Sequence, residues 1–351
     1  MPIKVLIIDD SALIRQMLTE LLSGDPAIEV VGTAADPLIA REKIKALSPD
    51  VLTLDIEMPR MDGLTFLEKL MALRPMPVLV VSTLTQKGAD AALRALELGA
   101  VDCVAKPLMD VRNGMAALGA ELVAKVKVAA RSRPRGRSVG LATRPPLTID
   151  PNLSTAGRIV AIGASTGGVE TLQQLLGRLP ATTPAIVITQ HMPAGFTSSF
   201  ARRLDGQCAM TVNEASDGRR VLPGHVLIAP GARHLEVVRT GAHYECRLHD
   251  GPPVSGHRPS VDVLFHSVAM AAGSNAMGLI LTGMGKDGAA GLLAMRQAGA
   301  RTLGQSETSC IVYGMPKAAM QAGAVQAEMS VDQLAREIVG RGVAAEQLAA
   351  R

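Results

Sequence analysis

Two stretches of the chain alternate short apolar runs with amphipathic segments, and this alternation restricts the fold more than any other feature. The apolar runs are IKVLIID, EVVGTA, DVLTLDI, PVLVVST and DCVAK in the first stretch, and RIVAIGAS, AIVITQH, HVLIAP, GLILTGM and RTLGQS in the second. Buried strands that alternate with helices form parallel sheets covered by helices on both faces. We therefore predict an α/β chain with two doubly wound parallel-sheet domains.

The alternation is interrupted once, by a segment rich in Arg, Pro, Gly and Ser that contains few residues able to form a core. Such a composition is typical of an exposed linker between domains. We predict a first domain over residues 1–125, a basic linker over 126–155 and a second domain over 156–351. In the second domain, residues 233–250 alternate around a Gly and predict a β-hairpin, and a last helix is expected over 331–349.

Composition excludes several classes of function. The chain has 351 residues, enough for two cores, and a formal net charge of +4, but residues 129–157 alone hold five arginines against one aspartate. The excess charge therefore does not predict a nucleic-acid-binding surface. No apolar run is long enough to span a bilayer, and the N-terminus does not resemble a signal peptide. The four cysteines lack metal-type spacing. We expect a cytoplasmic protein with reduced thiols and no direct membrane insertion.

In the first domain, polar residues stand where predicted strands end: Asp9, Asp10, Asp55, Thr83 and Lys106. The carboxyl ends of parallel strands meet in one crevice, and clustered carboxylates favour a hard divalent cation such as Mg²⁺. Lys106 and Thr83 offer a positive charge and a hydroxyl to an incoming phosphoryl group, and Asp55 is the candidate nucleophile. A single aspartate at a strand end is more often a turn residue; the complete set favours a phosphoryl-accepting site.

These residues resemble the receiver domain of two-component response regulators, which has a flavodoxin-like fold. The resemblance is carried by DD near the N-terminus, LDIEMPRMDG around Asp55, ST at 82–83 and AKP at 105–107. It implies phosphotransfer from a histidine kinase to Asp55. It also implies a Mg²⁺ site at Asp9, Asp10, Asp55 and the backbone carbonyl of Glu57, with Thr83 and Lys106 as switch residues. Cys103 stands where many receivers carry Tyr or Phe.

A second group of reactive residues follows strands of the second domain. Ser165 stands in a tight turn between a strand and a helix, in RIVAIGASTGGVETLQQLL, where free N–H groups and the helix dipole favour an oxyanion. His191 is the last residue of AIVITQH, directly after the predicted strand, and Asp287 follows the run GLILTGM. All three are expected at one edge of a parallel sheet. They form a set suited to a serine nucleophile, an imidazole base and a carboxylate that orients the base.

Other interpretations of this region are weaker. GASTG matches G-x-S-x-G, but an α/β-hydrolase has the order Ser, Asp, His, whereas this chain has Ser, His, Asp. The glycines lack the spacing of a dinucleotide-binding loop and no P-loop lysine follows. Asp262 is the alternative to Asp287 for orienting His191. We expect Ser260 to cap a helix that begins near Val261, and His225, His234, His249 and His257 to occupy turn or hairpin positions.

The complete chain resembles the chemotaxis protein-glutamate methylesterase/protein-glutamine glutaminase family (CheB-type). The motifs are GASTGG at 163–168, QHMP at 190–193, HRPSVDVLF at 257–265 and TGMGKDG at 282–288, in the order receiver, linker, hydrolase. The resemblance implies a Rossmann-like serine hydrolase domain with a β-hairpin and a catalytic triad of Ser165, His191 and Asp287. It also implies that the Met284 N–H binds the oxyanion, that Thr166 supports the site and that the hydrolase needs no cofactor.

The expected activity is therefore hydrolysis of γ-methyl glutamate esters on methyl-accepting chemoreceptors, with deamidation of receptor glutamines. We expect the unphosphorylated receiver to cover the serine site and phosphorylation of Asp55 to open it. One alternative is a phospho-dependent binding module whose serine site is inert. Another is a DNA-binding regulator, but that class predicts a helix-turn-helix unit where this sequence has strands and glycines.

Overall fold

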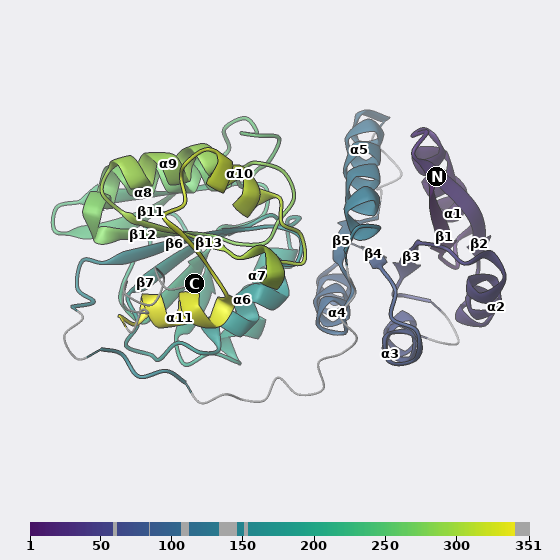
Figure 1. The fold of residues 1–351 in the computed structure, drawn as a ribbon, viewed down its shortest axis with the longest axis horizontal. Coiled ribbons are helices and arrows are strands. Elements are labelled where there is room, and N and C mark those ends of the chain that lie inside the picture. Colours follow the sequence, from purple (N-terminus) through teal and green to yellow (C-terminus); the bar gives the residue numbers. More distant parts are fainter. Residues whose placement is uncertain (59–61, 84, 107–111, 133–145, 151–153, 341–351) are drawn as a thin grey trace, which may run out of the picture. The chain divides into compact units, whose positions relative to one another are not determined.

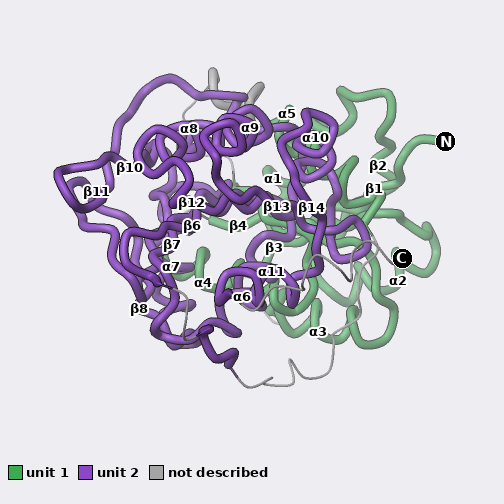
Figure 2. The backbone as a smooth tube through the Cα atoms, turned by 60° about the vertical axis from the view of Figure 1, so that its left-hand side comes forward, with its two compact units in different colours: residues 1–141 green, residues 142–351 purple. Residues whose placement is uncertain are grey.

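A computed structural model describes residues 1–58, 62–83, 85–106, 112–132, 146–150 and 154–340. The chain divides into two compact units, residues 1–141 and 142–351 (Figure 2). Each unit has its own sheet and its own core, so each is described by itself.

The first unit is a five-stranded parallel sheet in the order β2-β1-β3-β4-β5. Its elements are β1 (Ile3–Ile8), α1 (Ala12–Ser23), β2 (Ile28–Ala34), α2 (Pro37–Leu47), β3 (Val51–Asp55), α3 (Gly63–Leu73), β4 (Val78–Ser82), α4 (Gln86–Glu97), β5 (Asp102–Ala105) and α5 (Arg112–Ala129). Every residue of β3 and β4 is buried, because helices cover both faces of the sheet (Figure 1). The predicted doubly wound fold is confirmed.

The second unit is a seven-stranded parallel sheet in the order β14-β13-β12-β6-β7-β9-β8, with a separate antiparallel hairpin β10-β11. Its strands are β6 (Ile159–Ala164), β7 (Ala185–Gln190), β8 (Thr211–Glu214), β9 (His225–Ile228), β10 (His234–Thr240), β11 (His243–His249), β12 (Ala276–Ile280), β13 (Arg301–Gln305) and β14 (Ala327–Met329). The predicted hairpin is confirmed. The sequence did not predict β8 and β14, which are short strands at the two edges of the sheet and lack a continuous apolar run.

Helices cover both faces of this second sheet (Figure 1). They are α6 (Gly168–Leu176), α7 (Phe196–Asp205), α8 (Val261–Ala272), α9 (Ala289–Gln297), α10 (Met315–Gln321) and α11 (Val331–Ile338), with short 3-10 turns at Gly273–Asn275 and Glu307–Ser309. The helix expected over 331–349 ends at Ile338, two residues before Gly340, whose positive φ of 76° is unsuited to a helix. Residues 341–349 of that prediction lie outside the described residues.

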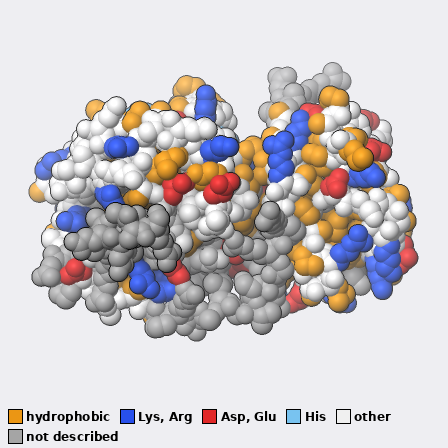
Figure 3. Space-filling view, in the orientation of Figure 1, with side chains coloured by type: hydrophobic (Ala, Val, Ile, Leu, Met, Phe, Trp, Pro, Cys, Tyr) orange, Lys and Arg blue, Asp and Glu red, His pale blue; other side chains and the backbone are white. Residues whose placement is uncertain are grey.

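Two further features bear on function. Among the residues that the structure describes, no helix combines the length and the apolar character needed to cross a membrane. On the face visible in Figure 3, Lys and Arg side chains stand at several separate places among other side chains rather than in one continuous patch.

Helix α5 continues past residue 125, into the predicted linker, most of which lies outside the described residues.

Candidate active site

The main chain of Ser165 is fixed on both sides by the elements that surround it. Ser165 directly follows β6, and its N–H donates to the Thr282 carbonyl oxygen at 3.0 Å. Its own carbonyl oxygen accepts from Gly168 N–H at 2.7 Å and from Gln190 Nε2 at 2.9 Å. Gly167 turns the chain into α6 with a φ of 79°, a conformation that favours glycine. The Ser165 side chain is therefore held, partly exposed, at the carboxyl edge of the sheet.

The loop after β12 approaches Ser165 closely, and only glycine permits this approach. A Cβ atom at Gly283 would clash first with Sδ of the flexible Met315 side chain, and would also lie 2.8 Å from Ser165 Cβ and 3.1 Å from Ser165 N. Gly283 is in turn anchored by hydrogen bonds to the segment that leads into α10: its N–H donates to the Val312 carbonyl, and its carbonyl accepts from Met315 N–H at 2.8 Å. The TGMGKDG motif thus places its backbone directly against Ser165.

We expect Gly283→Ala to lower the rate at which Ser165 reacts, because the added methyl group must displace Ser165. Overpacking of this kind costs about 1–3 kcal/mol of folding stability. Acylation of Ser165 by a serine-directed probe, together with the melting temperature, measures both effects. The control is Gly206→Ala at the end of α7, where a Cβ would meet only ordinary contacts at 3.7 Å; equal acylation rates in the two variants would contradict the expected crowding.

His191 and Asp287 form a buried hydrogen-bonded pair beside this loop. His191 Nε2 lies 2.8 Å from Asp287 Oδ2, and the two side chains are 9% and 1% exposed. Nδ1 of His191 is buried and has no hydrogen-bond partner among the described residues. The ring of His257 stacks on that of His191, with centroids 3.8 Å apart and planes at 14°. Strands β12, β6 and β7 are neighbours, so Ser165, His191 and Asp287 follow three adjacent strands at one edge, as the sequence predicts.

Asp287 is held by the N-terminus of α8. Its Oδ2 accepts from Val261 N–H at 2.8 Å, and its Oδ1 accepts from Ser260 Oγ at 2.8 Å and Asp262 N–H at 3.0 Å. Burial raises the pKa of this carboxyl group, but the hydrogen bond and charge of His191 and the α8 amide donors outweigh burial and lower the pKa to about 2. Asp287 is therefore ionised throughout the neutral range and can fix the orientation of His191.

The alternative carboxylate, Asp262, bonds elsewhere. Its Oδ1 accepts from Gly291 N–H at 2.8 Å, in the first turn of α9, and its Oδ2 accepts from Ser255 Oγ at 3.2 Å. Burial, and then the nearby charge of Asp287, raise the pKa of Asp262. Asp287, not Asp262, is hydrogen-bonded to His191. As expected, Ser260 is the N-cap residue of α8.

Two backbone positions next to Ser165 bear on oxyanion binding. Met284 N–H follows the anchored Gly283 and donates to no acceptor in the part of the chain that the structure describes. Thr166 is buried, and its carbonyl oxygen accepts from Thr282 Oγ1 at 3.0 Å, which ties the Ser165 turn to the loop after β12. The loop and the turn are thus held together, with an amide donor left available beside the serine.

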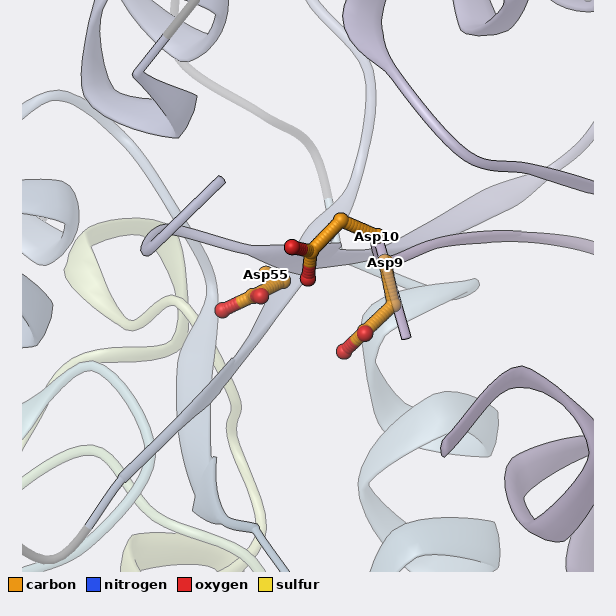
Figure 4. A group of neighbouring side chains, drawn as sticks. All are labelled: Asp9, Asp10 and Asp55. Atoms are coloured by element: carbon orange, nitrogen blue, oxygen red, sulfur yellow. The ribbon is translucent and has the colours of Figure 1, made fainter. Parts of the chain in front are cut away.

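In the first unit, Asp9, Asp10 and Asp55 gather at the carboxyl edge of the sheet (Figure 4). One carboxylate oxygen from each lies within 4.8 Å of the others. Lys106 Nζ lies 3.0 Å from Asp9 Oδ2 and 2.7 Å from Asp55 Oδ2. Burial, and then the charge of Asp55, raise the pKa of Asp9. For Lys106, burial lowers the pKa, but the hydrogen bonds and charges of Asp55 and Asp9 outweigh burial and raise it. The cluster carries excess negative charge that one lysine only partly compensates.

This cluster fits a hard divalent cation. Asp9 Oδ2 and Asp55 Oδ2 are buried and contact Lys106 without other hydrogen-bond partners among the described residues, while Asp10 is exposed. Oxygen ligands of this kind, open to solvent on one side, suit Mg²⁺. Thr83 lies at the same edge, but its hydroxyl donates to the Glu57 side chain at 2.9 Å. The Glu57 side-chain contact is a feature that the sequence analysis did not predict.

Two residues have surroundings that the sequence did not specify. His257 closes a tight turn with Val254, as expected, and its ring also stacks on His191; its place in the HRPSVDVLF motif was the available signal. Cys103, at the position where many receivers have an aromatic residue, is a buried residue of β5. Burial, then the charge of Asp102, raise the pKa of its thiol to about 12, so the thiol is unreactive at neutral pH.

The first parallel sheet carries a cluster of carboxylates and a lysine at its carboxyl edge. The second sheet carries a serine, a histidine and a buried aspartate at the corresponding edge. Together they define a response regulator whose output unit is a hydrolase. The comparisons agree: residues 5–118 match the response regulator receiver domain and residues 160–338 match the CheB methylesterase domain. The chain belongs to the protein-glutamate methylesterase/protein-glutamine glutaminase family.

Relatives of this name match over nearly their whole length. The protein from Pectobacterium atrosepticum is 56% identical over 346 residues, which cover 99% of each chain, and that from Salmonella typhimurium is 56% identical over 97% of each chain. Among solved structures, the catalytic domain of Thermotoga maritima CheB methylesterase matches with a TM-score of 0.52 and 36% identity. It covers 53% of this chain and 98% of that chain.

Proposed function

We propose that this chain is a cytoplasmic hydrolase that removes methyl esters from glutamates of chemoreceptors, deamidates receptor glutamines and is activated by phosphorylation of Asp55. The observation that carries the hydrolase assignment is the buried His191–Asp287 pair, held by α8 beside Ser165. An ionised carboxylate hydrogen-bonded to an imidazole, at the same sheet edge as a fixed serine, is the arrangement that activates a serine nucleophile. Both relatives are named for these two activities.

In the proposed reaction, His191 acts through Nδ1. Because its Nε2 faces Asp287 Oδ2 at 2.8 Å, the neutral ring carries its proton on Nε2 and keeps the Nδ1 lone pair free. Nδ1 takes the proton from Ser165 as the serine oxygen attacks the ester or amide carbonyl. The imidazolium then returns the proton to the leaving methanol or ammonia, and water hydrolyses the acyl-enzyme. The Met284 N–H, beside Thr166, would stabilise the negative charge that develops on the substrate oxygen.

In the receiver, Asp55 would accept a phosphoryl group from a histidine kinase. Lys106, already 2.7 Å from Asp55 Oδ2, would pair with a phosphoryl oxygen, and the Thr83 hydroxyl would exchange Glu57 for the same group. Mg²⁺ held by Asp9, Asp10, Asp55 and the backbone carbonyl of Glu57 would supply positive charge that compensates the carboxylates and the phosphoryl group. The hydrolase site needs no metal in this proposal.

The experiment that tests the proposal is methanol release from methylated chemoreceptor fragments, with and without a small phosphodonor and Mg²⁺. We expect release in both conditions and a higher rate with the phosphodonor. An unchanged rate would show that phosphorylation does not control the hydrolase. No release in either condition would favour the alternative, a phospho-dependent binding module, and labelling of Ser165 by a serine-directed probe would then separate an inert serine from an active one with another substrate.

A further inference from the structure

Ser260 makes a shorter hydrogen bond to the proposed active site than to the helix it caps. Its Oγ lies 2.8 Å from Asp287 Oδ1 but 3.5 Å from Val263 N, the amide that it caps in α8. Ser260 is completely buried. An ionised carboxylate only accepts hydrogen bonds, so the single hydroxyl proton of Ser260 is donated to Asp287. The bond to a charged acceptor is the stronger of the two contacts.

This hydroxyl supplies half of the hydrogen bonds to one oxygen of Asp287. Oδ1 accepts from Ser260 Oγ and from Asp262 N–H, whereas Oδ2 accepts from Val261 N–H and lies against His191. The carboxylate plane is therefore fixed by donors on both oxygens. Without the hydroxyl, Oδ1 would keep one donor and the carboxylate could rotate away from His191 Nε2.

Ser260 is itself fixed by a buried histidine of the hairpin. Its N–H donates to His234 Nδ1 at 3.2 Å, and His234 Nε2 donates to the Pro252 carbonyl at 3.0 Å. His234 is fully buried, and burial lowers its pKa, so the ring stays neutral with its proton on Nε2. The result is a connected series from β10 through the start of α8 to the end of β7: His234, Ser260, Asp287, His191.

We propose that Ser260 is a positioning residue for the proposed hydrolysis, whose hydroxyl aligns Asp287 with His191 in addition to capping α8. The inference deepens the proposed function and rests on it. The titratable groups that face Asp287 are His191 from the end of β7, Asp262 on α8 and His234 on β10; His257 faces His191 from the other side of its ring.

Variants of the full-length chain can separate alignment from capping. Ser260→Ala removes both functions, whereas Ser260→Gly removes the hydroxyl but weakens a helix cap much less than alanine does. Ser260→Thr keeps a hydroxyl. The matched control is Ser330→Ala, because Ser330 caps α11 in a capping box with Gln333, and among the described residues its hydroxyl contacts none of the site residues. The readout is the rate at which a fluorophosphonate probe labels Ser165, measured against pH, beside the melting temperature.

We expect Ser260→Ala and Ser260→Gly to label about tenfold more slowly than the parent chain, a factor of the size that one charge-assisted hydrogen bond supports. The acid limb of their labelling profile should move to lower pH, because a carboxylate that rotates away from His191 Nε2 stabilises the protonated imidazole less. Ser260→Thr should restore most of the rate. Ser330→Ala should lower the melting temperature and leave both rate and pH profile unchanged.

Two outcomes would overturn the inference. One is a parent-like rate and pH profile in Ser260→Gly, which would reduce Ser260 to a cap. The other is equal slowing in Ser330→Ala, which would make the effect one of general stability. The low-field proton resonance of His191 Nε2–H provides a readout that needs no reaction: it should broaden in Ser260→Gly and persist in Ser330→Ala. If the parent chain is not labelled but this resonance behaves as expected, the proposed function fails while the alignment by Ser260 stands.

Discussion

Replacing Ser165 by Ala is expected to lower methanol release from methylated receptor fragments by a factor on the order of 10⁶, to the background of the assay. The reason is that the acyl-enzyme cannot form without the serine oxygen, whereas His191, Asp287 and the Met284 N–H remain in place but have no nucleophile to activate. The measurement is methanol release at saturating substrate, with and without phosphodonor. Both rates should fall together, because phosphorylation would act upstream of a step that no longer exists.

The substitution should leave the fold intact. Ser165 is anchored through its backbone, by hydrogen bonds to Thr282, Gly168 and Gln190, and none of these uses its hydroxyl. The melting temperature should therefore match the parent, and Asp55 should still become phosphorylated. Ser198→Ala on α7, whose hydroxyl donates to the Gly195 carbonyl, is the control and should keep full activity. Substantial methanol release by Ser165→Ala would show that another residue is the nucleophile and would refute the proposed mechanism.

The sequence predicted the fold well where local patterns decide it. Continuous apolar runs identified the central strands, because strands buried on both faces must be apolar throughout. The same argument failed for β8 and β14, since an edge strand has fewer neighbours and needs no such run. The end of α11 was misplaced because apolar residues beyond Ile338 continued the helical pattern past Gly340. Domain boundaries stay predictions.

The candidate site was predictable to the extent that it depends on strand ends. Ser165, His191 and Asp287 follow adjacent parallel strands, so topology alone brings them to one edge. Their catalytic roles stay predictions. What the sequence could not give were contacts between elements far apart in the chain: the ring of His257 on His191, and the hydroxyl of Ser260 on Asp287. Both depend on how α8 and the loop before it approach the sheet, which no local periodicity encodes.

Asp55→Asn is expected to abolish the response to phosphodonor, so that methanol release is the same with and without it, while basal release stays close to that of the parent chain. An amide is not a nucleophile toward phosphorus, and Asp55 is the buried carboxylate of β3 that Lys106 contacts at 2.7 Å. Lys106 keeps its contact with Asp9 at 3.0 Å, so the substitution leaves the lysine paired and the receiver folded. In the proposed mechanism, basal release depends on Ser165, His191 and Asp287, in the other unit.

A control at the opposite end of the same strand tests whether the effect belongs to the site or to any lost charge. Asp50, just before β3, is exposed, and its carboxylate accepts from Lys4 N–H at 2.8 Å, a bond that an amide oxygen can replace. Asp50→Asn should therefore keep both basal release and its rise with phosphodonor. Stimulation that survives in Asp55→Asn would place the phosphoryl group on another residue, and the remaining carboxylates of the cluster, Asp9 and Asp10, would be tested next. Loss of stimulation in both variants would show instead that receiver charge in general, not a phosphoryl group on Asp55, controls the hydrolase.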